Sequence, residues 1–209
     1  MKEQLEKVIS AASSTHTDRR LHLFNIALDS CDATTVKLSG KVLESAQLKA
    51  LLQKMPAGIK VDASAVQVLG KEKKTVRYVA TNLTDLHREP SWISELMTQF
   101  TNGTPLEILE EQERWCFVRM PEHGYLGWAY KPYQTESAPL PATHLVASPI
   151  GLVYAEPAAA EHPMTRLSIA TAVHVTETRG DFARVQFTGT MLPAGWIATA
   201  DLRPEASFP

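Results

Sequence analysis

The feature that most constrains this 209-residue chain is a stretch of sequence that occurs twice. When Glu89 is aligned with Glu156, 67 positions later, Pro90 aligns with Pro157 without a gap. The same shift aligns further identical residues: Met97-Thr98 with Met164-Thr165, Thr104 with Thr171, Glu110 with Glu177 and Val118 with Val185. After one inserted residue, Gly127-Trp128 aligns with Gly195-Trp196. We interpret this run as an internal duplication, so the chain must contain one small fold twice.

Each copy has the pattern of a small β unit with tight turns. A Glu-Pro dipeptide ends regular strand pairing, because proline has no N–H to donate. Asn102-Gly103 suits a turn with positive φ, and Leu106 and Ile108 alternate with polar neighbours, as in strands with one buried face. Short strands separated by frequent turns predict two small all-β barrels, at residues 75–137 and 143–205.

The first copy also contains a set of short motifs that resembles a known family. The motifs are Arg88-Glu89-Pro90, Met97-Thr98-Gln99, Gly103-Thr104-Pro105, Leu106–Glu110, Trp115, Val118–Pro121 and Gly124–Trp128. Together they resemble a bacterial SH3-like (SH3b) domain. More narrowly, they resemble the paired SH3-like domains that precede the papain-like catalytic domain of NlpC-type endopeptidases, which cleave γ-D-glutamyl-diamino-acid bonds in cell-wall peptides. The second copy matches more loosely, since Ala155 stands in place of Arg88.

The resemblance implies two substrate-binding residues. In those endopeptidases the first SH3-like domain packs on the catalytic cleft, and two of its side chains help to receive the free amino end of the substrate peptide. The matching positions here are Glu89 and Tyr125. A carboxylate and a phenol oxygen can both accept hydrogen bonds from an ammonium group. Because Glu156 repeats Glu89, a purely structural role in the turn remains open for this glutamate.

The aromatic residues of the first copy suggest a third binding residue. Trp115 and Trp128 recur in the second copy as Phe182 and Trp196, which favours a place in the barrel core. Trp92 does not recur as an aromatic residue and is expected in a loop. An exposed tryptophan is costly unless it meets a partner, so Trp92 is a candidate for substrate binding.

The region before the duplication has a mixed pattern. The expected elements are a helix at Glu3–Ala12, a strand at Leu21–Leu28 buried on both faces, a strand at Val36–Leu43, a helix capped by Ser45 that runs to Met55, and a strand within Ile59–Leu69. This order predicts an α+β domain at residues 1–70. It resembles the BON-type fold, whose second strand is similar to Leu38–Val42.

No motif for catalysis or for a cofactor is evident. The seven histidines lack metal-binding spacing, and neither a Gly-x-Ser-x-Gly elbow nor a phosphate-binding glycine loop occurs. The nucleophile of the resembling peptidases lies in an Asp-Cys-Ser-Gly context, whereas Cys31 precedes Asp-Ala and Cys116 precedes Phe-Val. A disulfide between them is disfavoured, because Cys116 is expected as a buried thiol on a strand. We therefore expect no catalytic residue, metal or cofactor in this chain.

These observations predict an α+β N-terminal domain followed by two small all-β SH3-like barrels. The expected function is the non-catalytic recognition part of a peptidoglycan endopeptidase, with a papain-like catalytic domain as partner in cis or in trans. The alternative is a stand-alone module that binds the cell wall or a protein partner, and a structural scaffold is a third possibility. A net charge of −2 gives no reason to expect a nucleic acid, and no stretch has the length of a membrane span. The N-terminus lacks an export signal, so the location is cytoplasmic if Met1 is native and the cell envelope if a signal peptide was removed.

Overall fold

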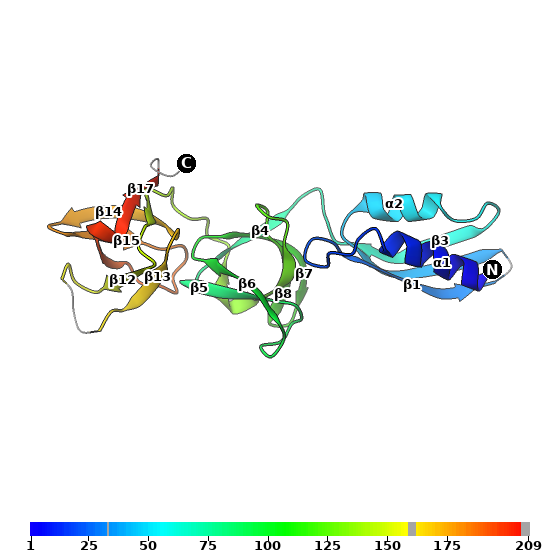
Figure 1. Ribbon diagram of the computed structural model, residues 1–209, viewed down its shortest axis with the longest axis horizontal. Helices are drawn as coiled ribbons and strands as arrows, with labels where there is room; N and C mark the ends of the chain where they lie inside the picture. The colour runs from blue at the N-terminus through cyan, green and yellow to red at the C-terminus, as the bar shows by residue number, and fades with distance from the viewer. Residues whose placement is uncertain (33, 159–161, 206–209) are drawn as a thin grey trace. The chain divides into compact units, whose positions relative to one another are not determined.

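The computed structural model in Figure 1 describes residues 1–32, 34–158 and 162–205. The chain divides into two compact units. The first contains Met1–Lys74 together with the short segment Glu122–Leu126, and the second contains Thr75–Pro121 with Gly127–Pro209. No helix in the described part of the chain has the length and apolar character needed to cross a membrane.

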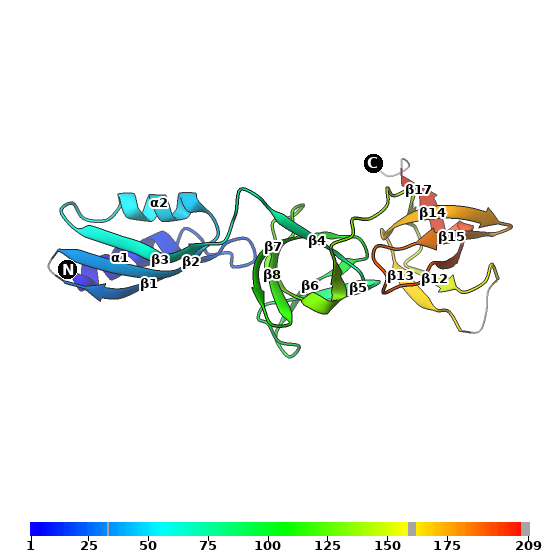
Figure 2. The ribbon, with the colours of Figure 1, turned by 180° about the vertical axis from the view of Figure 1, so that it is seen from behind.

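The first compact unit is a three-stranded sheet with two helices. Its elements in chain order are α1 (Lys2–Ser13), β1 (Phe24–Cys31), β2 (Thr35–Val42), α2 (Ser45–Gln53) and β3 (Lys60–Val68). The sheet order is β1-β2-β3, antiparallel between β1 and β2 and parallel between β2 and β3. In Figure 2 the three strands lie in front of α1. Leu5 and Ile9 of α1, Leu38 of β2 and Leu51 of α2 belong to one core, so both helices are held by the sheet.

Two expectations for this unit were wrong in detail. The first strand is not buried on both faces: Phe24, Ile26 and Leu28 pack on the core, whereas the residues between them are exposed. This alternation follows from a sheet that buries one face. The second helix is capped by Glu44 and not by Ser45, because the Glu44 N–H donates to the Gln47 side chain at 2.8 Å.

The second compact unit contains two seven-stranded sheets. The first β unit consists of β4 (Thr75–Val79), β5 (Leu83–His87), β6 (Leu96–Thr101), β7 (Pro105–Gln112), β8 (Trp115–Arg119), β9 (Leu126–Tyr130), the 3-10 turn η1 (Lys131–Tyr133) and β10 (Gln134–Thr135). The second β unit consists of β11 (His144–Val146), β12 (Ile150–Tyr154), β13 (Thr165–Ser168), β14 (Ala172–Arg179), β15 (Phe182–Gln186), β16 (Gly195–Ala198), η2 (Thr199–Asp201) and β17 (Leu202–Pro204).

The two sheets have the same strand order. The first runs β10-β4-β7-β8-β9-β5-β6, and the second, taken from its other end, runs β17-β11-β14-β15-β16-β12-β13. Each order has two edge strands, so the described strands do not close into the expected barrels. In both sheets one edge is very short, with two residues in β10 and three in β17. Short edges of this kind limit pairing with other strands.

Backbone details also coincide at positions 67 residues apart. The Gly103 N–H donates to the Val79 carbonyl at 2.9 Å, and the Ala170 N–H donates to the Val146 carbonyl at 2.8 Å. Both turn residues have positive φ, 82° at Gly103 and 65° at Ala170. The second turn thus keeps the conformation of the first although it has lost the glycine that suits it.

Candidate ligand-binding surface of the first β unit

The loop that joins β5 to β6 presents Glu89. Its two ends are tied together, because the Arg88 N–H donates to the Glu95 carbonyl and the Arg88 guanidinium pairs with the Glu95 carboxylate, both at 3.0 Å. Within the loop the Glu89 N–H donates to Ser94 Oγ at 3.0 Å, and the Ser91 N–H donates to the Glu89 carbonyl at 2.7 Å. These hydrogen bonds use the backbone of Glu89 and leave its exposed side chain outside the loop's internal contacts.

The equivalent turn in the second β unit bears on the role of Glu89. There the Ala158 N–H donates to the Glu156 carbonyl at 2.7 Å, which reproduces the bond between Ser91 and Glu89. The shared bond is made by backbone atoms and does not require either carboxylate. Neither Glu89 nor Glu156 has a side-chain hydrogen bond or ion pair to the rest of the described chain, so the Glu89 carboxylate is available to a ligand.

Trp92, in the same loop, lies in a cluster of aromatic rings. We call this group the ring cluster, and it consists of His87, Trp92, Trp115, Tyr130 and Tyr133. The Trp92 ring centroid lies 4.9 Å from those of Trp115 and Tyr130, 5.6 Å from that of His87 and 6.1 Å from that of Tyr133. Trp92 is 50% exposed. The loop therefore places a half-exposed indole over rings that come from β5, β8, β9 and η1.

The position of Trp115 corrects the sequence-based expectation that it belongs to the core. Cys116 and Val118 on β8 are fully buried, so alternation along the strand turns Trp115 and Phe117 to the other face. Trp115 is half-buried and contacts Tyr130 at 5.4 Å. Trp128 is likewise half-buried and packs on Phe117, with 5.2 Å between ring centroids. Trp115 is three residues before Val118, so in a strand the two side chains lie on opposite faces. With Val118 in the core, this spacing could have placed Trp115 on the outer face.

His87 is the buried member of the ring cluster, with 4% exposure. Its ring meets those of Trp92 and Trp115 at 85° and 88°, in edge-to-face contacts that fix the orientation of both indoles. Its Nδ1 lies 3.3 Å from the Ser94 carbonyl oxygen. Its Nε2 is buried without a hydrogen-bond partner in the described chain, and Asp85 Oδ2 is 3.8 Å away.

Tyr125, the third residue expected to bind substrate, belongs to the other compact unit. It is half-buried, and the Arg20 guanidinium carbon lies 5.8 Å from its ring centroid. The next residue is fixed by a backbone bond, in which the Leu126 N–H donates to the Arg20 carbonyl at 2.7 Å. The structure thus places Glu89 and Trp92 in one loop and describes Tyr125 beside Arg20, a contact that the sequence did not indicate.

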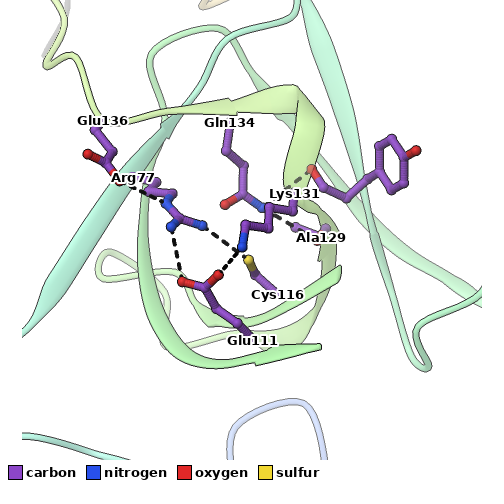
Figure 3. Close-up of polar contacts among 8 residues, drawn as sticks. Arg77, Glu111, Cys116, Ala129, Lys131, Gln134 and Glu136 are labelled. Carbon is purple, nitrogen blue, oxygen red and sulfur yellow. Dashed lines mark hydrogen bonds and ion pairs between the residues drawn. The ribbon is translucent and has the colours of Figure 1, made fainter. Parts of the chain in front are cut away.

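The first β unit also contains a charged network, which contacts Cys116 on the face of β8 opposite to Trp115 (Figure 3). Glu111 on β7 accepts hydrogen bonds from Lys131 and, at 3.0 Å, from Arg77, while Arg77 Nε lies 3.7 Å from Glu136. The hydrogen bond from Lys131 is the main reason that the pKa of Glu111 is lowered, and the Arg77 charge adds to it. The charges of this network are therefore balanced internally.

Cys116 is not an activated nucleophile. The Arg77 guanidinium donates to Cys116 Sγ at 3.5 Å, as Figure 3 shows, but burial raises the pKa of the Cys116 thiol. A buried, protonated thiol is a poor nucleophile. Cys31 and Cys116 are both free. In the part of the chain that the structure describes, no group of three His, Cys, Asp or Glu residues could hold a metal ion.

Comparison with protein families now identifies part of this surface. The family model described as "Bacterial dipeptidyl-peptidase Sh3 domain" matches residues 86–129. This segment carries a bacterial SH3-type sequence, and it includes the β5–β6 loop with Glu89 and Trp92, as well as Trp115 and Tyr125. The match lies within the first β unit, without β4, η1 and β10, and leaves the rest of the chain unassigned. A comparison with curated proteins found no match.

Solved structures show weak similarity. An NlpC/P60 family protein from Bacillus cereus ATCC 10987 is 15% identical over 62% of this chain and 56% of that one, with a TM-score of 0.49. NlpC2 from Trichomonas vaginalis is 16% identical over 64% of this chain and 49% of that one, with a TM-score of 0.28. NlpC1 from the same organism is 15% identical over 64% and 46%, with a TM-score of 0.28. This chain spans about half the length of these proteins.

Proposed function

We propose that this chain is the non-catalytic recognition part of a cell-wall peptidase. In this proposal the two β units are tandem SH3-like domains, the N-terminal unit is BON-like, and a papain-like domain in cis or in trans supplies the chemistry. The observation that carries the proposal is the bacterial SH3-type match at residues 86–129, which includes an exposed carboxylate on a well-fixed loop.

The first β unit would shape the substrate cleft for a peptide that begins with a free L-alanine. Glu89 would accept hydrogen bonds from the ammonium group, and a charged acceptor makes the stronger bond with such a donor. The family resemblance assigns substrate binding to Tyr125 as well, through a phenol oxygen that can accept from an ammonium group, and Trp92 would cover the apolar side of the peptide. Glu95, the other carboxylate of the β5–β6 loop, is paired with Arg88, which leaves Glu89 as the carboxylate that a cationic terminus would meet there.

The experiment compares substrates with a free and with an acetylated terminus. An NlpC-type catalytic domain is combined with this chain, and kcat/KM is measured for L-alanyl-γ-D-glutamyl-diamino-acid peptides. With the native chain we expect the free amine to be preferred, and Glu89→Gln to reduce this preference about tenfold, since one charge-assisted bond is lost. Glu156→Gln, at the equivalent turn, is the matched control and should leave the preference unchanged. Equal effects of the two substitutions would contradict the assignment of Glu89.

The alternative function is a stand-alone module that binds the cell wall or a protein partner. The observation in its favour is the ring cluster, whose half-exposed Trp92 lies on a fixed loop without any need for a second domain. The two functions differ in their dependence on a partner. A cleft wall alone should bind muropeptides weakly, whereas a true binding module should retain purified peptidoglycan in a pull-down without a catalytic domain.

A further inference from the structure

The ring cluster is not required by the fold of the first β unit. The second β unit has the same strand order and provides a direct comparison. The positions equivalent to His87, Trp115, Tyr130 and Tyr133 are Tyr154, Phe182, Ala198 and Asp201, the last two after the one-residue insertion. There only Tyr154 and Phe182 form a ring contact, at 6.4 Å. Because the same sheet forms without the remaining rings, the cluster in the first β unit needs another explanation.

The polar edges of the cluster are available to a ligand. The indole N–H groups of Trp92 and Trp115 and the hydroxyl groups of Tyr130 and Tyr133 make no hydrogen bond to other described residues, and none of these four residues is fully buried. Aromatic residues of this kind combine apolar ring faces with a polar edge, which is why they are frequent in binding surfaces. The cluster therefore offers ring faces and free donors at the same place.

The charges around the cluster favour a neutral ligand. One charge of each sign lies against the cluster: Asp85 Oδ2 is 3.8 Å from His87 Nε2, and the Arg114 guanidinium carbon is 5.9 Å from the Tyr130 ring centroid. An anionic ligand would meet Asp85, and a cationic ligand would meet Arg114.

We propose that the ring cluster is a binding site for a neutral saccharide. A pyranose has one face of C–H groups, which suits the electron-rich face of an indole, and a rim of hydroxyl groups, which suits free N–H and O–H groups. Trp92 provides the exposed ring face, and the edge-to-face contacts with His87 hold Trp92 and Trp115 in place. The site itself is independent of the proposed function; only the choice of a cell-wall N-acetylhexosamine as probe rests on it.

The test is to titrate the whole chain with the N-acetylglucosamine tetramer. Isothermal titration calorimetry measures the affinity, and saturation-transfer NMR shows which sugar protons contact the protein. We expect saturable binding, with transfer strongest to the ring C–H protons of the sugar. Trp92→Ala should weaken binding about tenfold, because one ring contact is lost. Ile93→Ala, which changes the neighbouring residue with 97% exposure, and Phe182→Ala, in the second β unit, should both leave binding within about twofold.

Trp115→Phe provides a second measurement that does not depend on the loop. It keeps an aromatic ring and removes only the indole N–H and part of the face, and it should weaken binding by a smaller factor than Trp92→Ala.

Circular dichroism shows whether each variant is folded. Absence of tetramer binding to the folded native chain, or equal binding by native, Trp92→Ala and Trp115→Phe chains, would overturn the proposal. Binding of a proline-rich or apolar peptide at Trp92 in place of the sugar would also overturn it. The two proposals assign Trp92 different ligands, a peptide and a sugar, so peptide binding at Trp92 would overturn the saccharide site alone, and the Glu89 experiment does not depend on which of them binds.

Discussion

The two β units share a backbone and differ in what they build on it. They have the same strand order and turns of the same conformation at Gly103 and Ala170. The first unit adds the ring cluster, a buried ion pair and a buried asparagine, whereas the second has smaller or neutral residues at the equivalent positions. The comparison separates residues that specify the sheet from residues that serve something else.

One cross-strand pair shows the difference clearly. Glu107 on β7 is opposite Arg119 on β8, and the two form a double hydrogen bond at 2.9 and 3.0 Å. At the same place in the second unit, His174 on β14 is opposite Gln186 on β15. The first unit therefore contains a charged pair that its sheet does not need, and such pairs are costly to break.

The largest expected effect is that of Glu107→Ala. Glu107 is 2% exposed, so its removal leaves the Arg119 guanidinium partly buried without this carboxylate. We expect a loss of about 3 kcal/mol in the free energy of unfolding, as for other broken buried pairs. His174→Ala, the matched change in the second unit, should cost less than about 1 kcal/mol. Urea unfolding followed by fluorescence measures both, and a cost at His174 that equals the cost at Glu107 would refute the distinction.

Asn102→Ala should have the next largest effect. The buried Asn102 amide donates to the Val79 and Thr81 carbonyls, both at 3.2 Å, and to the Thr188 carbonyl at 3.3 Å, while its oxygen accepts from the Thr188 N–H at 2.8 Å. Alanine would remove all four bonds and leave the Thr188 N–H without its Asn102 acceptor, although the Val79 carbonyl would keep the Gly103 N–H, and we expect a cost of about 2 kcal/mol. The equivalent residue, Ile169, is 54% exposed. Ile169→Ala should therefore change the unfolding midpoint little, and the comparison fails if the two substitutions shift it equally.

The two β units share a close approach of one strand to the next at a glycine, Gly127 in the first unit and Gly195 in the second, and this shared packing can be tested. A Cβ at Gly127 would lie 2.9 Å from the His87 carbonyl oxygen, and a Cβ at Gly195 would lie 2.9 Å from the Tyr154 carbonyl oxygen. Since both contacts involve backbone, we expect Gly127→Ala and Gly195→Ala each to cost about 1–2 kcal/mol. Differential scanning calorimetry of the two variants should give similar shifts. Tolerance of alanine at one position alone would show that the two sheets are less alike than their strand order suggests.

The sequence predicted the features that depend on local pattern. The shift of 67 residues aligned the turns at Gly103 and Ala170, which both have positive φ. The run around Leu106 and Ile108 indicated a strand, which is β7, but the expectation of one buried face was wrong because Glu107 and Leu109 are buried as well. Glu89 and Trp92 were expected outside regular strands and lie in the β5–β6 loop. Periodicity and turn chemistry are local, so a single sequence contains them.

The sequence did not predict features that depend on distant residues. The role of Asn102 depends on Thr188, 86 positions away, and the dipeptide Asn102-Gly103 was explained by its turn alone. Trp115 was assigned to the core because it recurs as Phe182, although the phase of β8 turns it to the surface. Recurrence shows that a position keeps an aromatic residue but does not show on which face of the strand it lies.

The smallest expected effect concerns the charged network of Arg77, Glu111 and Lys131. The hydrogen bond from Lys131, and then the Arg77 charge, lower the pKa of Glu111. A carboxyl group with a lowered pKa stabilises the folded state above its ordinary pKa of about 4.3, and this contribution is lost as the pH falls through the lower value in the folded state. Glu111 is 37% exposed, so solvent limits the gain to a few tenths of a kcal/mol.

We expect Glu111→Gln to lower the thermal midpoint slightly at pH 7 and to have no effect near pH 2. Thr178→Ala, the equivalent change in the second unit, removes no charge and should shift the midpoint equally at both pH values. A shift from Glu111→Gln that stays constant with pH would mean that packing, and not charge, makes the first unit different at this position.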